Sequence, residues 1–123
     1  MSRLLIVDDE IDIREFARNF FRKRGIDVFT ASGGSEALEI VENEHPDLIL
    51  LDVRMEEMTG VEFLHKLRET GDQTRVMMVS GVEDEDVMNE AASLGVLGFI
   101  HKPLILGELQ KVVMKELEAD HRP

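Results

Sequence analysis

Short apolar runs recur along the chain at intervals that suit strands separated by helices. The runs are Leu4–Val7, Val28–Ala31, Leu48–Leu51, Val76–Val79 and Val96–Ile100. Apolar and polar positions do not alternate in the first, third and fourth runs, which is typical of strands covered on both faces. The pattern therefore predicts five strands of a parallel sheet.

Helical signals fill the segments between and after these runs. Four segments carry apolar residues at helical spacing, namely Ile13, Phe16, Ala17 and Phe20; Ala37, Leu38 and Val41; Val87, Ala91 and Leu94; and Leu109, Val112, Val113 and Leu117. The capping-box spacing of Thr59–Glu62 opens a further helix. Gly25 and Gly95 end the first and fourth helices, and the second ends before Pro46.

Strand and helix thus alternate five times. Crossovers between parallel strands are right-handed, so this alternation predicts an α/β fold with a single doubly wound five-stranded parallel sheet and helices on both faces. In such sheets, ligands bind beyond the carboxyl ends of the strands. Polar residues at those ends are therefore the first candidates for a functional site.

Several apolar runs stop at chemically active side chains. Asp8 and Asp9 follow the first run, Asp52 the third, Ser80 the fourth and Lys102 the fifth. Like charges at one edge of a sheet are costly unless a cation sits among them. Three carboxylates and one lysine leave a charge of about −2, which suits a divalent cation, and Mg²⁺ prefers such oxygen ligands. The convergence points to metal-assisted phosphoryl chemistry, with a carboxylate as the nucleophile.

The composition narrows the class of protein. A chain of 123 residues is long enough for one domain, and the absence of Cys excludes disulfides and thiolate sites. A formal charge of −12 disfavours direct binding to nucleic acid or to an anionic membrane. No apolar stretch is long enough for a signal peptide or a membrane span, so we expect a soluble cytoplasmic domain.

Four motifs in this order and spacing resemble the receiver domains of two-component response regulators. They are Leu5–Glu10, Asp47–Met55, Ser80-Gly81 and Gly98–Pro103, and the likeness covers essentially the whole chain. The resemblance implies a flavodoxin-like sheet of order 2-1-3-4-5. We expect the receiver domain at 1–120 and a short tail at 121–123, either as a stand-alone regulator or as the N-terminal piece of a larger one.

The resemblance also implies roles at the acidic edge. Asp52 would be the phosphoacceptor. Asp8 or Asp9, with Asp52 and the backbone carbonyl of Arg54, would hold Mg²⁺. Lys102 would pair with the phosphoryl oxygens, and the bond from this lysine to the next proline is often cis in the family.

Two further residues would carry the signal in such a domain. Ser80 would be the hydroxyl residue that follows the phosphoryl group, and Phe99 the aromatic that changes rotamer with it. The implied donor is the phosphohistidine of a sensor kinase or phosphotransfer protein. The output would be a changed partner-binding face on the fourth helix, fifth strand and fifth helix, or a phosphorylation-dependent homodimer. This describes a signalling switch rather than an enzyme that releases a product.

The chain departs from the family pattern in the loop after Asp52. Glu56 stands where receivers usually carry a proline, so the loop loses a rigid residue and gains acids near the metal edge. We hypothesise an effect on loop order or on Mg²⁺ affinity. Arg54 and Val82 occupy the positions that tune hydrolysis of the acyl phosphate. Neither side chain would position a water, so we predict slow to moderate self-dephosphorylation.

Alternative interpretations remain at single residues. Asp8 or Asp9 could cap the first helix, Ser80 could open a capping box with Glu83, and Phe99 could be plain core. We interpret the scattered histidines as surface residues, namely His45, His65, His101 and His121.

Two other protein classes and a degenerate receiver also remain as alternative interpretations of the whole chain. A haloacid-dehalogenase-type phosphatase would carry an acid at position 54, where this chain has Arg54. A flavin-binding flavodoxin would want a Gly-rich, hydroxyl-rich loop where Asp8-Asp9-Glu10 stands. A degenerate receiver would not take up phosphate, and the full set of acids with Ser80 and Lys102 weighs against it.

Overall fold

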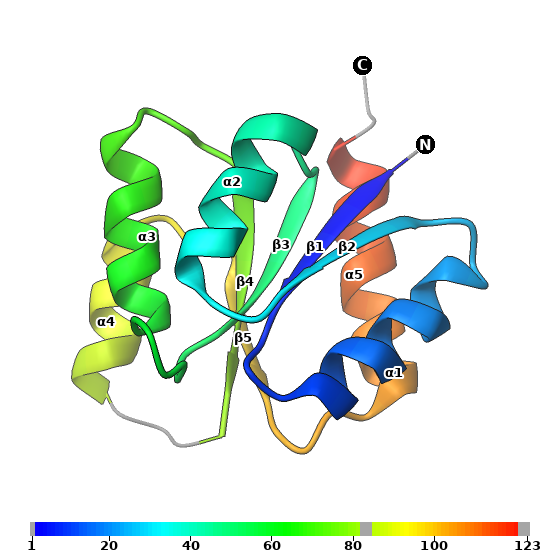
Figure 1. Cartoon of the computed structure of the whole chain (residues 1–123). Helices are drawn as coiled ribbons and strands as arrows, with labels where there is room; N and C mark the ends of the chain where they lie inside the picture. The colour runs from blue at the N-terminus through cyan, green and yellow to red at the C-terminus, as the bar shows by residue number, and fades with distance from the viewer. Residues whose placement is uncertain (1, 82–84, 121–123) are drawn as a thin grey trace.

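The computed structural model describes residues 2–81 and 85–120, in which five parallel strands alternate with five helices (Figure 1). The strands are β1 (Arg3–Val7), β2 (Asp27–Ala31), β3 (Leu48–Asp52), β4 (Arg75–Ser80) and β5 (Gly98–His101). The helices are α1 (Ile11–Arg22), α2 (Gly34–Glu44), α3 (Gly60–Glu69), α4 (Glu85–Ser93) and α5 (Leu106–Asp120). The sheet order is β2-β1-β3-β4-β5, so the predicted fold class and strand order are confirmed.

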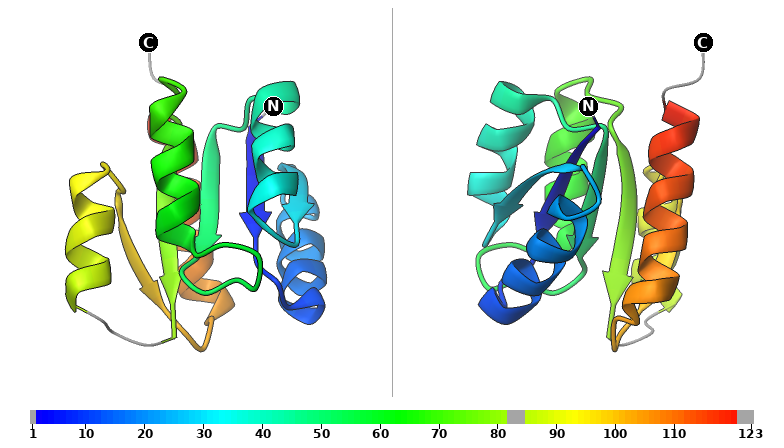
Figure 2. Two further views of the ribbon diagram at one scale, coloured as in Figure 1. Left: turned by 60° about the vertical axis from the view of Figure 1, so that its left-hand side comes forward. Right: turned by 90° about the vertical axis from the view of Figure 1, so that its right-hand side faces the viewer.

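The sheet lies between two layers of helices (Figures 1 and 2). Alternate residues of each central strand enter different cores. In β1, Leu4 and Ile6 pack with buried residues of α1 and α5, whereas Leu5 and Val7 pack with buried residues of α2, α3 and α4. Both faces of the strand are therefore apolar, which is the physical reason that the sequence lacks alternation there.

The ends of the helices follow local chemistry. Gly25 and Gly95 have φ of +80° and +83° and follow the ends of α1 and α4, as predicted. Thr59 and Glu62 form the predicted capping box at the start of α3. The first helix differs from one interpretation, because its N-cap is Glu10 rather than Asp8 or Asp9. Asp8 instead accepts a hydrogen bond from the Glu10 backbone N–H, so its carboxylate faces the edge of the sheet.

The last strand is shorter than its apolar run predicts. β5 begins at Gly98, and Val96 and Leu97 precede it. Leu97 donates a backbone hydrogen bond to Val76 at 2.8 Å, but its side chain is 40% exposed. These two apolar residues connect the turn at Gly95 to the strand and lie outside the paired segment.

Some predictions fall on residues outside this description. Val82, Glu83 and His121 lie outside the described residues, as does the tail at 121–123. The capping-box interpretation of Ser80 depends on Glu83 and stays untested. Within 2–81 and 85–120, no helix is both long enough and apolar enough to cross a bilayer.

Candidate functional site

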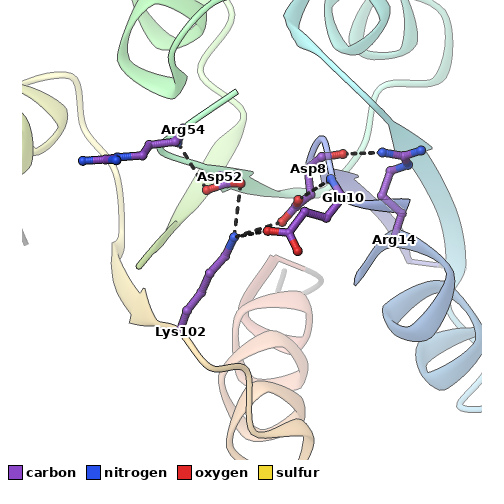
Figure 3. A network of polar contacts seen from close by, with 6 residues as sticks. All are labelled: Asp8, Glu10, Arg14, Asp52, Arg54 and Lys102. Carbon is purple, nitrogen blue, oxygen red and sulfur yellow. Dashed lines mark hydrogen bonds and ion pairs between the residues drawn. The ribbon is translucent and has the colours of Figure 1, made fainter. Parts of the chain in front are cut away.

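The predicted site residues gather at the carboxyl edge of the sheet (Figure 3). Asp8 follows β1, Asp52 is the last residue of β3, Ser80 is the last of β4, and Lys102 follows β5. Parallel strands place all their carboxyl ends at one edge, so these residues from distant parts of the chain become neighbours. The convergence predicted from the sequence is confirmed as a spatial arrangement.

Two buried carboxylates dominate the electrostatics of this edge. Asp8 is 3% exposed and Asp52 is 4% exposed. Burial raises the pKa of both side chains, because it penalises the charged form more than the nearby N–H donors and Lys102 favour it. The negative charge of Asp52 raises the pKa of Asp8 further, and that of Asp9 raises the pKa of Asp52. The fold thus holds a pair of anions whose charge is costly.

Lys102 is the cation that faces these carboxylates (Figure 3). Its Nζ lies 3.3 Å from Asp52 Oδ2, 3.6 Å from Asp8 Oδ2 and 3.6 Å from Glu10 Oε1. Burial on its own would lower the pKa of Lys102, but the surrounding acids outweigh burial and raise it. One lysine against three carboxylates leaves a charge of about −2 at this edge.

Backbone donors orient both carboxylates. Glu10 N–H donates to Asp8 Oδ1 at 2.9 Å, and Arg54 N–H donates to Asp52 Oδ1 at 3.3 Å. In each aspartate, the other oxygen is the one closest to Lys102. The side chain of Arg14 donates to the Asp8 carbonyl oxygen at 2.7 Å, which ties α1 to the end of β1. The two Oδ2 atoms are therefore held facing the same space.

The donor set fits a hard divalent cation. Carboxylate oxygens of Asp8, Asp9 and Glu10 lie within 4.8 Å of one another, and those of Asp9 and Glu10 are exposed. Asp52 does not belong to that group, and Lys102 stands between it and Asp8. An all-oxygen set with two exposed members suits Mg²⁺, which binds carboxylates and keeps several waters.

Ser80 lies in β4 and Phe99 in β5, the two strands that follow β3 in the order of the sheet. Ser80 is 2% exposed, and its carbonyl oxygen accepts a hydrogen bond from the Lys102 N–H at 2.8 Å. This bond fixes the start of the Lys102 side chain beside β4. Phe99 is half-buried and packs on the core beneath α2, α3 and α4. The bond between Lys102 and Pro103 is cis, as the family resemblance implied.

Three residues at this edge were not assigned from the sequence. Glu10 stood in the quoted motif, but its approach to Lys102 depends on side-chain direction. Arg14 lies one helical turn beyond, among several arginines of similar spacing. Gly60 has a sharper signal, since a Cβ there would come within 2.5 Å of the Asp52 carbonyl oxygen. A glycine after the Thr59 cap was visible in the sequence, but its neighbour was not.

Three of the four histidines lie in the described part of the chain. His45, His65 and His101 are exposed, as predicted. The ring of His65 lies 2.7 Å from Glu90 Oε1, where it joins α3 to α4.

Comparisons of the sequence agree on one family. The family model described as "Response regulator receiver domain" matches residues 4–114. The chain is 36% identical over 116 residues to "Sporulation initiation phosphotransferase F" of Bacillus subtilis, covering 94% of each chain. It is 32% identical over 118 residues to "Regulatory protein AtoC" of Escherichia coli, where it covers 96% of this chain but only 26% of that protein.

Solved structures agree with the sequence matches. A chemotaxis protein of Vibrio cholerae, CheY4, superposes with a TM-score of 0.88 at 31% identity, over 95% of this chain and 99% of that one. A CheY-like response regulator receiver domain protein of Methanospirillum hungatei superposes with a TM-score of 0.91 at 27% identity, over 98% and 96%. These matches do not favour the phosphatase or flavodoxin alternatives.

Proposed function

The chain belongs to the response regulator receiver domain family, and we propose from this premise that Asp52 accepts a phosphoryl group from a phosphohistidine. Members of the family are signalling regulators of two-component systems, and they generally bind Mg²⁺ at an acidic pocket. The observation that carries the proposal is the position of Asp52 Oδ2, 3.3 Å from Lys102 Nζ and beside a second buried carboxylate.

The transfer would use a carboxylate and a lysine that this edge presents, together with a bound Mg²⁺. Asp52 Oδ2 attacks the phosphorus of the donor, a new O–P bond forms, and the P–N bond to the imidazole breaks. The electron pair returns to the imidazole nitrogen, which takes up a proton. A carboxylate attacks without a general base because it is already ionised at neutral pH. Lys102 pairs with a phosphoryl oxygen and offsets the charge that arrives.

We propose that Mg²⁺ binds through Asp8, Asp9 and Asp52, with the Arg54 carbonyl oxygen as a further ligand. When bound, the ion would neutralise charge on the transferred group. The grouping of the Asp8, Asp9 and Glu10 carboxylates supports this set and adds Glu10 as a candidate, directly or through water. Lys102 faces the Oδ2 atoms of both Asp8 and Asp52, so it would have to move aside for one ion to contact both carboxylates.

Phosphorylation would act as a local charge change on a two-state domain. We propose that Ser80 and Phe99 carry the change to α4, β5 and α5, which form the face for a downstream protein or a second copy. Ser80 is joined to Lys102 through its carbonyl oxygen, and Phe99 packs against the core beneath α2, α3 and α4. A phosphoryl group held by Lys102 would thus pull on both strands that border this face.

The site's chemistry is tested by phosphorylation without a protein donor. We expect wild-type protein with Mg²⁺ and acetyl phosphate or phosphoramidate to gain one phosphoryl group by intact mass. Asp52→Asn removes the nucleophile with little change of shape and should gain none, whereas the exposed control Glu39→Gln should match wild type. Chelation of the metal should abolish the adduct. An unchanged adduct in Asp52→Asn would refute the assignment.

A groove beside Lys102 supports a protein as the donor. A cleft of about 300 Å³ runs between α1 and the start of α5, and its apolar lining residues are Ile13, Phe16, Ala17, Pro103, Leu104 and Leu106. Phe16 is 63% exposed beside it. We propose that the phosphohistidine protein docks there, because Lys102, which contacts Asp52, also lines this groove.

This docking can be separated from the chemistry. Phe16→Ser should slow transfer from a phosphorylated histidine phosphotransfer protein by about tenfold, because an interface aromatic typically contributes 1–2 kcal/mol. The rate with acetyl phosphate should stay the same. Equal slowing with both donors would contradict a docking role.

We further propose a receiver domain that spans residues 1–120, with 121–123 as its tail. The cytoplasmic location, the absence of direct nucleic-acid or membrane binding, and the slow to moderate self-dephosphorylation remain predictions. The chain spans nearly the full length of one bacterial relative and about a quarter of another. The activity of any longer protein is therefore a separate question.

A further inference from the structure

The loop from Val53 to Thr59 leads from the end of β3 into α3, and it rests on the start of α2. This loop carries Glu56, where receivers usually have a proline, and it also carries Arg54. A loop without that proline needs another source of order if it is to hold a backbone carbonyl at the site.

The start of α2 has no cap from its own side chains. Its N-cap is Gly33, which has extended backbone and no side chain to offer. The carboxylate of Glu57 takes this role from 22 residues away, since its Oε1 accepts the Ser35 N–H at 2.8 Å. Such a bond satisfies one of the helix's unpaired first-turn donors, and the negative charge suits the N-terminal end of the helix dipole. The Ser35 donors also lower the pKa of Glu57, which keeps it ionised.

The neighbouring methionine provides a second contact. A Cβ at Gly34 would come within 2.3 Å of Met58 Sδ, so the Met58 side chain lies directly on the glycine backbone. A Cβ at Gly33 would stand 3.7 Å from Glu57 Oε1. The loop tip therefore contacts α2 through one polar bond and one apolar contact, and the second requires glycine at position 34.

The start of the loop is tied to the sheet, and its end is tied back to its start. Val53 N–H donates to the Val79 carbonyl at 3.0 Å, and Gly60 N–H donates to the Val53 carbonyl at 2.9 Å. Between these ends and the tip lies Arg54, whose N–H reaches Asp52 Oδ1 at 3.3 Å. The path of the backbone at Arg54 is thus set by β3 on one side and by the contact with α2 on the other.

We infer that Glu57 is a positioning residue that, by capping α2, holds the loop after Asp52 and so sets the affinity of the site for Mg²⁺. This inference deepens the proposed function and rests on it for the metal. The contact with α2 stands independently of any metal. Glu57 would supply by a tertiary bond the order that a proline would supply by covalent restriction.

The first measurement is hydrogen exchange of the Ser35 amide in metal-free protein. We expect Glu57→Ala to speed exchange at Ser35 by about fivefold, because the N–H loses its hydrogen-bond acceptor. Glu56→Ala is the matched control, since it removes the neighbouring exposed acid. Glu57→Gln keeps an acceptor oxygen and should recover most of the protection. Unchanged exchange at Ser35 in Glu57→Ala would overturn the inference.

The second measurement is the Kd for Mg²⁺ by titration calorimetry on the same variants. Loss of charge alone would weaken Mg²⁺ binding about equally in Glu56→Ala and Glu57→Ala. Positioning predicts a Kd at least about threefold higher in Glu57→Ala than in Glu56→Ala, with recovery in Glu57→Gln despite its lost charge. Equal Kd values in the two alanine variants would overturn the inference while leaving the proposed function intact. Absence of Mg²⁺ binding in wild type would overturn the proposed function, and the metal part of the inference with it.

Discussion

At the scale of single residues, the site is built from charges that the fold holds at a cost. Burial raises the pKa of Asp8 and Asp52, so the folded state binds their protons more tightly than the unfolded chain does. Stability from this source is therefore present at low pH and is lost as pH rises from the ordinary aspartate value of 3.8 through the raised folded pKa. At neutral pH, both carboxylates destabilise the metal-free fold.

The first prediction concerns this cost. Asp52→Asn should raise the free energy of unfolding in metal-free buffer at pH 7 by on the order of 1 kcal/mol, because the amide resembles the favoured neutral form. Urea unfolding in the presence of a chelator measures the change, with Glu39→Gln as the surface control. Saturating Mg²⁺ should stabilise wild type more than the variant. A less stable metal-free Asp52→Asn would show that the attraction to Lys102 outweighs burial.

The second prediction concerns pH and the metal. Mg²⁺ needs deprotonated ligands, and the pKa values of Asp8 and Asp52 are raised by burial, so protons compete for the site at higher pH than they would for exposed acids. We expect the Kd for Mg²⁺ to increase between pH of about 7 and about 5, a range in which ordinary aspartates stay ionised. Calorimetry at both values tests this. A constant Kd would argue for exposed ligands only.

At the scale of elements, one arginine joins several of them. Arg68 of α3 donates from Nε to the Leu94 carbonyl at 2.9 Å, and from Nη1 to the carbonyls of Asp72 at 3.0 Å and Thr74 at 2.9 Å. It thus connects the end of α4 with the turn that leads into β4. Burial lowers the pKa of this guanidinium, although nearby Asp72 acts in the opposite direction.

The third prediction follows from these bonds. Arg68→Ala should lower the free energy of unfolding by about 2 kcal/mol, because it leaves half-buried carbonyls without their charged donor. Arg68→Lys keeps the charge but lacks the forked geometry, so it should restore only part of the loss. Lys66 lies two residues before Arg68 in α3 and is exposed, so Lys66→Ala should change the free energy of unfolding by less than about 0.5 kcal/mol. Chemical unfolding with equal m-values would measure all three.

At the scale of the whole molecule, a net charge of −12 lies on a fold whose stability comes from two apolar layers on a parallel sheet. Excess charge of one sign repels itself and destabilises the compact state, and dissolved salt screens that repulsion. We therefore expect monovalent salt to screen the net charge of the whole surface, and Mg²⁺ to act at the acidic edge.

The fourth prediction separates these responses. Raising NaCl from about 0.02 to about 0.2 M should raise the thermal midpoint of wild type and Asp52→Asn alike, because screening acts on the whole surface. A few millimolar MgCl₂ should add a further rise in wild type, and a smaller one in the variant. Differential scanning fluorimetry reads both effects. An equal Mg²⁺ response in the two proteins would place the ion away from Asp52.

The sequence by itself determined the strands, the helices and the meeting of Asp8, Asp52, Ser80 and Lys102 at one edge. Apolar runs without alternation dictate a sheet covered on both faces, and every parallel sheet collects its carboxyl ends together. Local chemistry likewise set the capping box at Thr59 and the glycine turns. These features follow from short stretches of chain and from topology, so a pattern is enough to predict them.

Only the tertiary structure decided how atoms face one another at that edge. It turned Glu10 toward Lys102, made Glu10 rather than an aspartate the N-cap of α1, and started β5 at Gly98 instead of Val96. It also brought Glu57 onto a helix 22 residues earlier in the chain. Side-chain direction and loop path depend on packing between distant segments, and no spacing along the sequence encodes them.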